Sequence, residues 1–139
     1  MAKKVKTSVT FETQGDRSFT CIVDYDFKGY GLIGYGKTAR EAEADVFTEI
    51  EEMRTIDGRT DVADIEITRR KFDVGSFFSY YPFFNISSFA RFTGLNPTQV
   101  RQYASGVRQP TAQKRQQLND AIQSVVETLF KDSRAFSID

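Results

Sequence analysis

The side chains best suited to bind a charged ligand lie in a stretch that carries no carboxylate. Residues 74–119 contain no aspartate or glutamate, and their only charged residues are basic: Arg91, Arg101, Arg108, Lys114 and Arg115. A surface that approaches a polyanion excludes carboxylates, because they repel phosphates, whereas basic, amide and hydroxyl side chains reach phosphates and base edges. The composition of this stretch therefore favours contact with nucleic acid.

The net charge of the whole chain conceals this asymmetry, because 19 basic and 19 acidic residues cancel. Residues 1–75 carry 12 basic and 15 acidic side chains, a net charge of −3, whereas residues 76–139 carry 7 and 4, a net charge of +3. Such a difference between halves is typical of a protein in which one half contacts nucleic acid. An uneven but solvated surface would give the same split, so the charge alone does not decide between them.

Residues for catalysis or metal binding are scarce. The chain has no histidine, and Cys21 is its single cysteine, so the usual acid-base group is missing and no internal disulfide can form. Asp24 and Asp26 share a strand face as a candidate metal-binding pair, but a two-metal nuclease needs several converging acids. The glycine-rich run of residues 29–36 could also cradle a phosphate, but we interpret it as a short strand of the sheet. We therefore expect no enzymatic activity, no cofactor and no metal.

Alternating apolar residues predict a small sheet in the first half. Residues 5–11 and 19–25 alternate on either side of a turn signal, which is the period of a half-buried hairpin. Residues 29–36 follow as a short third strand, in which four glycines allow close approach or positive φ. The register of the second strand places these residues on one face: Phe19, Cys21, Val23 and Tyr25.

A helix and a last strand complete this half. Thr38 and Glu41 form a capping box that opens a helix, and Asp57-Gly58 ends it. Residues 62–70 are then expected to form a strand with Ile65 and Ile67 facing inward. The order β-β-β-α-β buries little by itself, so a helical domain or a partner subunit is expected to complete it. The inner face of the helix is predicted to be Ala39, Ala42, Val46, Ile50 and Met53.

The acid-free stretch predicts two short helices joined by a tight turn. Gly94 suits the end of the first helix, Asn96 suits the cap of the second, and Pro97 fits its first turn. Ala90 is small where the two helices would cross. The core positions are expected to be Leu95, Val100 and Tyr103, which leaves Thr98, Gln99 and Gln102 exposed and Arg101 toward the flank.

Two apolar features flank these helices. The first is an aromatic block, which could stack single-stranded bases but is more typical of the core of a helical bundle; it comprises Phe77, Phe78, Tyr80, Tyr81, Phe83, Phe84, Phe89 and Phe92. The second is a final helix capped by Thr111, whose apolar stripe either closes the domain or forms a dimer interface. The stripe consists of Leu118, Ile122, Val125, Val126 and Leu129.

The first half resembles a known family. The run from Phe19 to Gly31 and the motif Gly36-Lys-Thr-Ala-Arg-Glu-Ala42 resemble the HicB antitoxin domain over about residues 5–70. This resemblance implies a partial ribonuclease H or double-stranded-RNA-binding fold, and a partner that is a small mRNA-cleaving toxin, HicA. The run Asp24-Tyr-Asp-Phe-Lys stands where related domains often have a proline-containing turn.

Residues 75–129 resemble the lambda-repressor-like, or Xre-type, helix-turn-helix domain, through the run from Gly94 to Gly106 and the basic loop that ends at Pro110. This resemblance implies that the second of the two helices reads base edges in the major groove of DNA. The base-reading residues would be Thr98, Gln99 and Gln102. The phosphate-binding residues would be Ser87, Asn96, Arg101, Arg108, Lys114 and Arg115.

The sequence therefore predicts an α+β protein with a HicB-like sheet domain at residues 1–73 and an all-α helix-turn-helix domain at residues 74–139. We expect a cytoplasmic, sequence-specific DNA-binding transcriptional regulator, the antitoxin of a toxin-antitoxin pair that represses its own operon. Its partners would be a palindromic double-stranded DNA operator, a small basic ribonuclease toxin and further copies of itself in a homodimer or higher oligomer. No apolar run is long enough to cross a membrane. The alternative is an orphan module that binds protein or RNA and uses the helical half as a scaffold.

Overall fold

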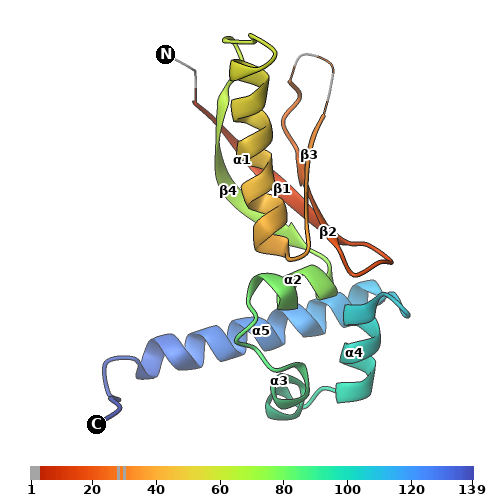
Figure 1. The fold of residues 1–139 in the computed structure, drawn as a ribbon. Coiled ribbons are helices and arrows are strands. Elements are labelled where there is room, and N and C mark those ends of the chain that lie inside the picture. Colours follow the sequence, from red (N-terminus) through yellow and green to blue (C-terminus); the bar gives the residue numbers. More distant parts are fainter. Residues whose placement is uncertain (1–3, 28, 30) are drawn as a thin grey trace.

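The computed structural model describes residues 4–27, 29 and 31–139, and in these residues the fold is α+β (Figure 1). A four-stranded mixed sheet and five helices follow one another in the order β-β-β-α-β-α-α-α-α. The elements are β1 (Lys4–Thr13), β2 (Phe19–Val23), β3 (Leu32–Gly36), α1 (Ala39–Thr55), β4 (Asp64–Phe72), α2 (Val74–Tyr80), α3 (Ile86–Thr93), α4 (Pro97–Ser105) and α5 (Ala112–Asp132).

The sheet has the strand order β3-β2-β1-β4. β1 pairs antiparallel with β2 and parallel with β4, and a bulge between Thr7 and Ser8 shifts the register of the parallel pair. The parallel pair follows from the crossover through α1, which lies across one face of the sheet (Figure 1). β3 and β4 are therefore the edge strands of this sheet.

The main core lies between the sheet and α1. Val9 and Phe11 of β1 and Cys21 of β2 are fully or almost fully buried against α1. The predicted inner face of α1 is confirmed at all five positions, and the Thr38 hydroxyl accepts from the backbone N–H of Glu41 at 3.1 Å, as a capping residue does. The sequence therefore predicted this helix and the face that it buries.

Several predicted strand limits differ from the structure. β2 ends at Val23, so Tyr25 lies beyond the strand with 37% of its surface exposed, and Asp24 and Asp26 do not share a strand face. β4 begins two residues later than expected, at Asp64, and ends at Phe72. Within the expected glycine-rich strand, β3 begins only at Leu32; Lys28 and Tyr30 lie outside the described residues.

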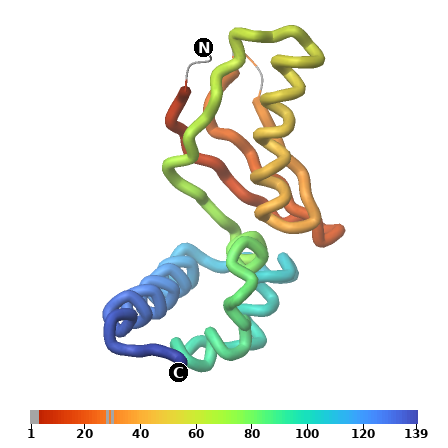
Figure 2. The backbone as a smooth tube through the Cα atoms, turned by 60° about the vertical axis from the view of Figure 1, so that its left-hand side comes forward, coloured from red at the N-terminus to blue at the C-terminus, as the bar shows by residue number. Residues whose placement is uncertain are grey.

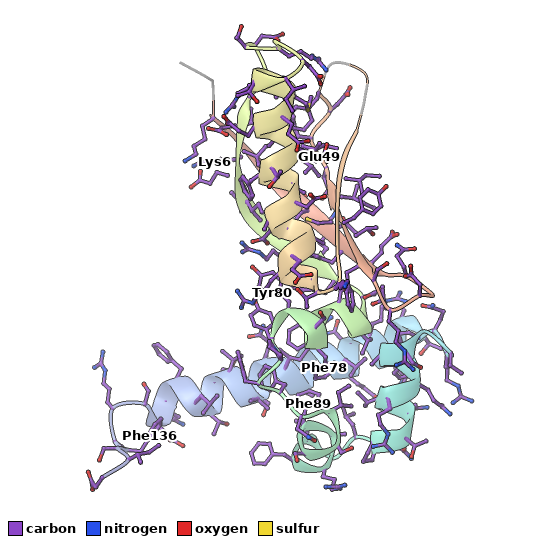
Figure 3. All side chains as sticks on the ribbon, in the orientation of Figure 1. Lys6, Glu49, Phe78, Tyr80, Phe89 and Phe136 are labelled. Atoms are coloured by element: carbon purple, nitrogen blue, oxygen red, sulfur yellow. The ribbon has the colours of Figure 1, made fainter. Side chains whose placement is uncertain are left out.

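The two halves of the chain are joined through α2. Asp73 caps α2 by accepting from the N–H of Ser76 at 2.8 Å, and it also accepts from the N–H of Thr13 on β1 at 2.6 Å. Tyr80, at the other end of α2, belongs to the core of the sheet (Figure 3). The Arg40 guanidinium lies 4.1 Å from the centre of the Tyr80 ring and donates to its carbonyl oxygen. The helical half thus completes one end of the sheet core, as the small size of that core led us to expect.

The helical half has its own core, in which Phe78 and Phe89 contact each other edge to face (Figure 3). Most of the predicted aromatic block is therefore packed, but Phe83 and Phe92 are largely exposed. α5 extends beyond this core, and its C-terminal end lies away from the sheet (Figures 1 and 2). Of the predicted stripe of α5, Leu118 is buried, whereas Val126 and Leu129 are exposed.

Candidate nucleic-acid interface

The turn between α3 and α4 has the local structure that its residues predict. Gly94 ends α3 with φ of 78°, a left-handed conformation that suits glycine, and its N–H donates to the last turn of α3. Asn96 caps α4 by accepting from the N–H of Gln99 at 3.1 Å, and Pro97 occupies the first turn. Ala90 is fully buried, which allows the helices to approach closely.

Burial on one side of α4 determines which side chains it presents. Val100 and Tyr103 are buried in the helical core, as predicted, and Leu95 packs against it. Thr98 and Arg101 are exposed, whereas Gln99 and Gln102 are half-buried. The three candidate base-reading residues therefore lie on one helix, with Thr98 more accessible than the two glutamines.

Two of the candidate phosphate-binding residues, Ser87 of α3 and Arg101 of α4, contact each other. The Arg101 guanidinium donates to the hydroxyl of Ser87, and it also donates to the Thr98 hydroxyl at 3.3 Å. Asn85 caps α3 by accepting from the N–H of Ser88 at 3.0 Å. The first turn of α3 and the outer side of α4 thus share one polar, cationic surface, which we call the α3–α4 face (Ser87, Thr98, Gln99, Arg101 and Gln102).

The remaining candidate residues are spread more widely. Arg108 is exposed in the connection from α4 to α5, and its backbone N–H donates to the carbonyl of Gln102. Lys114 is half-buried in the first turn of α5. Arg115 donates to the carbonyl of Pro110 and lines a groove toward β4. The Asn96 side chain caps α4, so its oxygen already has a partner within the turn.

The residues that could support catalysis are buried or already hydrogen-bonded within the fold. Cys21 is fully buried, and this burial raises the pKa of its thiol to about 12. Burial tends to raise the pKa of Asp24, but hydrogen bonds from Ser8, Lys71 and Thr10 outweigh it and lower that pKa below 3.8. No group of three or more metal-ligating side chains occurs among the described residues. Asp24 is therefore held by hydroxyl and ammonium groups on the open face of the sheet.

A further charged surface lies on α1, and it was not among the sites predicted from the sequence. The helix carries six acidic and two basic residues. Glu43 is held by Arg70 and Tyr80 of the same chain, but Glu41, Glu51 and Glu52 are exposed, as is Phe47. The run of acids between Glu41 and Glu52 was the signal in the sequence that predicts this surface.

Within the described residues, no helix is both long enough and apolar enough to cross a membrane. Protein-family models, curated proteins and solved structures were each compared with this chain, and none of them matches it.

Proposed function

We propose that this protein is a sequence-specific DNA-binding transcriptional regulator whose α3–α4 face contacts duplex DNA. In this proposal α4 lies in the major groove, where Thr98, Gln99 and Gln102 read base edges. Glutamine can pair bidentately with adenine, and threonine can contact the methyl group of thymine. Arg101, Ser87 and Arg108 contact the phosphates on either side.

The observation that carries this proposal is the combination of geometry and charge at the α3–α4 face. A capped helix follows another through a left-handed glycine, and its outer side bears amide, hydroxyl and guanidinium groups. No carboxylate occurs between Val74 and Asn119. A surface that bound a basic or neutral ligand would have no need to exclude acids over so long a stretch.

The test is a titration of duplex DNA from the promoter of the gene itself, at two salt concentrations. Each phosphate contact releases counterions, so log K is expected to fall with log salt with a slope of about 0.9 per contact. A slope of several units and tighter binding to the promoter than to random duplex are expected. Absence of binding at both salt concentrations would contradict the proposal and favour a helical half that acts only as a scaffold.

We also propose that the sheet half binds a small basic toxin, which makes this protein an antitoxin that represses its own operon. The acidic face of α1 supports a basic partner, because complementary charges accelerate association and select partners. The test is to mix the protein with the product of any short basic reading frame beside its gene and measure binding by calorimetry. Glu51→Lys with Glu52→Lys is expected to weaken binding; Asp120→Lys with Asp139→Lys, both exposed and outside α1, is the control with the same change of charge.

A further inference from the structure

A groove runs along α5, between the two halves of the molecule. It is bounded by the end of β4, by α2 with the turn that follows it, and by α5, and we call it the α5 groove. It encloses about 810 Å³, which lies within the range of about 300–1,000 Å³ that is typical of sites for small molecules. None of the residues proposed above to contact DNA or a toxin lines it.

The α5 groove is elongated. The residues of α5 that line it lie on one side of the helix and extend from Arg115 to Leu129. At a rise of 1.5 Å per residue, this stretch of helix is about 21 Å long. A ligand that fills the groove is therefore long and narrow.

The walls of the groove favour an alkyl chain over a flat aromatic ligand. The Phe77 and Phe84 rings stack with their centroids 5.9 Å apart, and the Phe77 ring also packs on Tyr81 at 5.1 Å. An aromatic ligand would have to compete with these contacts for a ring face. The wall formed by α5 is aliphatic and includes Leu118 and Ile122, against which an alkyl chain packs without a required orientation.

Part of the apolar lining is open to solvent. Phe83 is 74% exposed, Leu129 is 54% exposed and Val126 is 48% exposed, and all three line the groove. A ligand that covers these side chains removes apolar surface from water, which favours binding. The groove therefore offers an apolar ligand a driving force that the chain itself leaves unused.

The groove carries more positive than negative charge. The carboxylate of Asp73, its one acid, accepts from the backbone N–H and hydroxyl of Thr13 and from the N–H of Ser76. The charged residues in the last turns of α5 do not line the groove; they are Glu127, Lys131 and Asp132. Its basic lining residues are Arg69, Arg70, Lys71 and Arg115.

Two of these four basic residues have no acidic partner. Arg70 is paired with Glu43, and the Lys71 ammonium lies 3.2 Å from the Asp24 carboxylate. Among the described residues, Arg69 and Arg115 form no ion pair, and Arg115 donates only to a backbone carbonyl. A guanidinium binds a carboxylate through two parallel hydrogen bonds, so each of the two is suited to hold an anionic head group.

We propose that the α5 groove binds a free fatty acid. The alkyl chain lies along α5 between its aliphatic side chains and the aromatic residues of α2, and the carboxylate is held by Arg69 or Arg115. The chain satisfies the length and the apolar lining of the groove, and the carboxylate satisfies its excess of positive charge. This proposal does not rest on the proposed function, because the site lies outside the surfaces assigned to DNA and to the toxin.

The first test is calorimetric titration of the protein with octanoate, decanoate and dodecanoate, each below its micelle concentration. Affinity is expected to rise by about fourfold for each methylene that the groove buries. Absence of binding by all three acids, or an affinity that does not depend on chain length, would overturn the proposal. If none binds and the protein scatters light as two or more chains, another copy covers the groove, which would equally overturn it.

The second test separates the groove from other exposed apolar surface. Leu129→Asn changes a lining residue, whereas Phe130→Asn changes its neighbour on the same helix, which is 79% exposed and does not line the groove. Leu129→Asn is expected to weaken dodecanoate binding at least tenfold, and Phe130→Asn is expected to leave it unchanged. Equal affinities of the two variants would show that the acid only adsorbs to exposed apolar side chains.

The third test concerns the head group. Arg69→Gln with Arg115→Gln is expected to weaken dodecanoate binding at least tenfold and to leave binding of dodecanol, which has no charge, unchanged. Arg91→Gln with Arg134→Gln is the control with the same change of charge, since both residues are exposed and lie outside the groove. An equal loss in both pairs of substitutions, or an equal loss for acid and alcohol, would overturn the role of the guanidinium groups. None of these measurements contains DNA, so failure of the ligand site and failure of DNA binding are distinguished.

Discussion

At the scale of single residues, the polar side chains of the helical half fall into two groups. Gln99 and Gln102 lie on α4, the helix proposed to read bases. Both side chains are half-buried, which restricts their conformations. Arg108 lies on an exposed connection, where a guanidinium can reach a phosphate without any restriction on its orientation. Base contacts specify a sequence and phosphate contacts do not, so the two groups are expected to respond differently to the same truncation.

Gln99→Ala is expected to weaken binding to the operator by roughly 1–3 kcal/mol and to leave binding to random duplex unchanged. Arg108→Ala is expected to weaken binding to both duplexes alike and to reduce the salt slope by about one contact. Fluorescence anisotropy with the two duplexes measures both effects. Equal losses on operator and random DNA for both variants would show that Gln99 reads no base.

Asp24 gives the fold a dependence on pH. Its pKa is lower in the folded protein than the ordinary 3.8, so it contributes stability that is fully present above that value and is lost as the pH falls through the lowered pKa. Asp24→Asn is therefore expected to lower the melting temperature near pH 7 and to have a smaller effect below pH 3.8. Thermal unfolding of both proteins across pH 2–7 measures this, and a difference independent of pH would contradict it.

At the scale of elements, the glycines of β3 explain how closely α1 packs on the sheet. A Cβ at Gly34 would lie 2.1 Å from the carbonyl oxygen of Ala42, and a Cβ at Gly36 would lie 2.5 Å from the N–H nitrogen of Ala42. Both obstacles are backbone atoms of α1, which cannot move without displacing the helix. The glycine-rich strand therefore serves helix packing at these two positions.

Gly34→Ala is expected to destabilise the protein by more than the roughly 1–3 kcal/mol of ordinary overpacking, because the clash is with backbone. Gly15→Ala, where a Cβ would meet nothing within 4 Å, is the control and is expected to change stability little. Urea unfolding of the two variants measures the difference. Similar midpoints would show that α1 does not lie against β3 in solution.

The sequence predicted those elements that local chemistry determines. The capping residues Thr38, Asn96 and Thr111 mark the starts of α1, α4 and α5, and the apolar spacing of α1 gives its buried face. The predicted end of β2 was wrong, because alternation continues to Tyr25 although strand pairing stops at Val23. The groove that α5 forms with β4 and α2 could not be predicted either, because β4 and α2 are consecutive but α5 follows only after α3 and α4.

At the scale of the whole molecule, the two charged surfaces belong to different halves. The acids of α1 lie on the sheet half, and the α3–α4 face lies on the helical half, with α2 between them (Figure 1). Tyr80 and Asp73 tie α2 to the sheet, so the halves share packing and not only a linker. In the proposed function, the sheet half binds a basic protein and the helical half binds DNA.

The most direct test of the central proposal is the affinity for operator duplex of two variants with the same change of charge. Arg101→Glu reverses a charge on the α3–α4 face, whereas Arg134→Glu reverses one in the exposed segment after α5. Arg101→Glu is expected to reduce affinity at least tenfold, because it loses a phosphate contact and adds a repulsive carboxylate, and Arg134→Glu is expected to have a far smaller effect. Equal losses in the two variants, or full affinity in Arg101→Glu, would contradict the proposal that this face binds DNA.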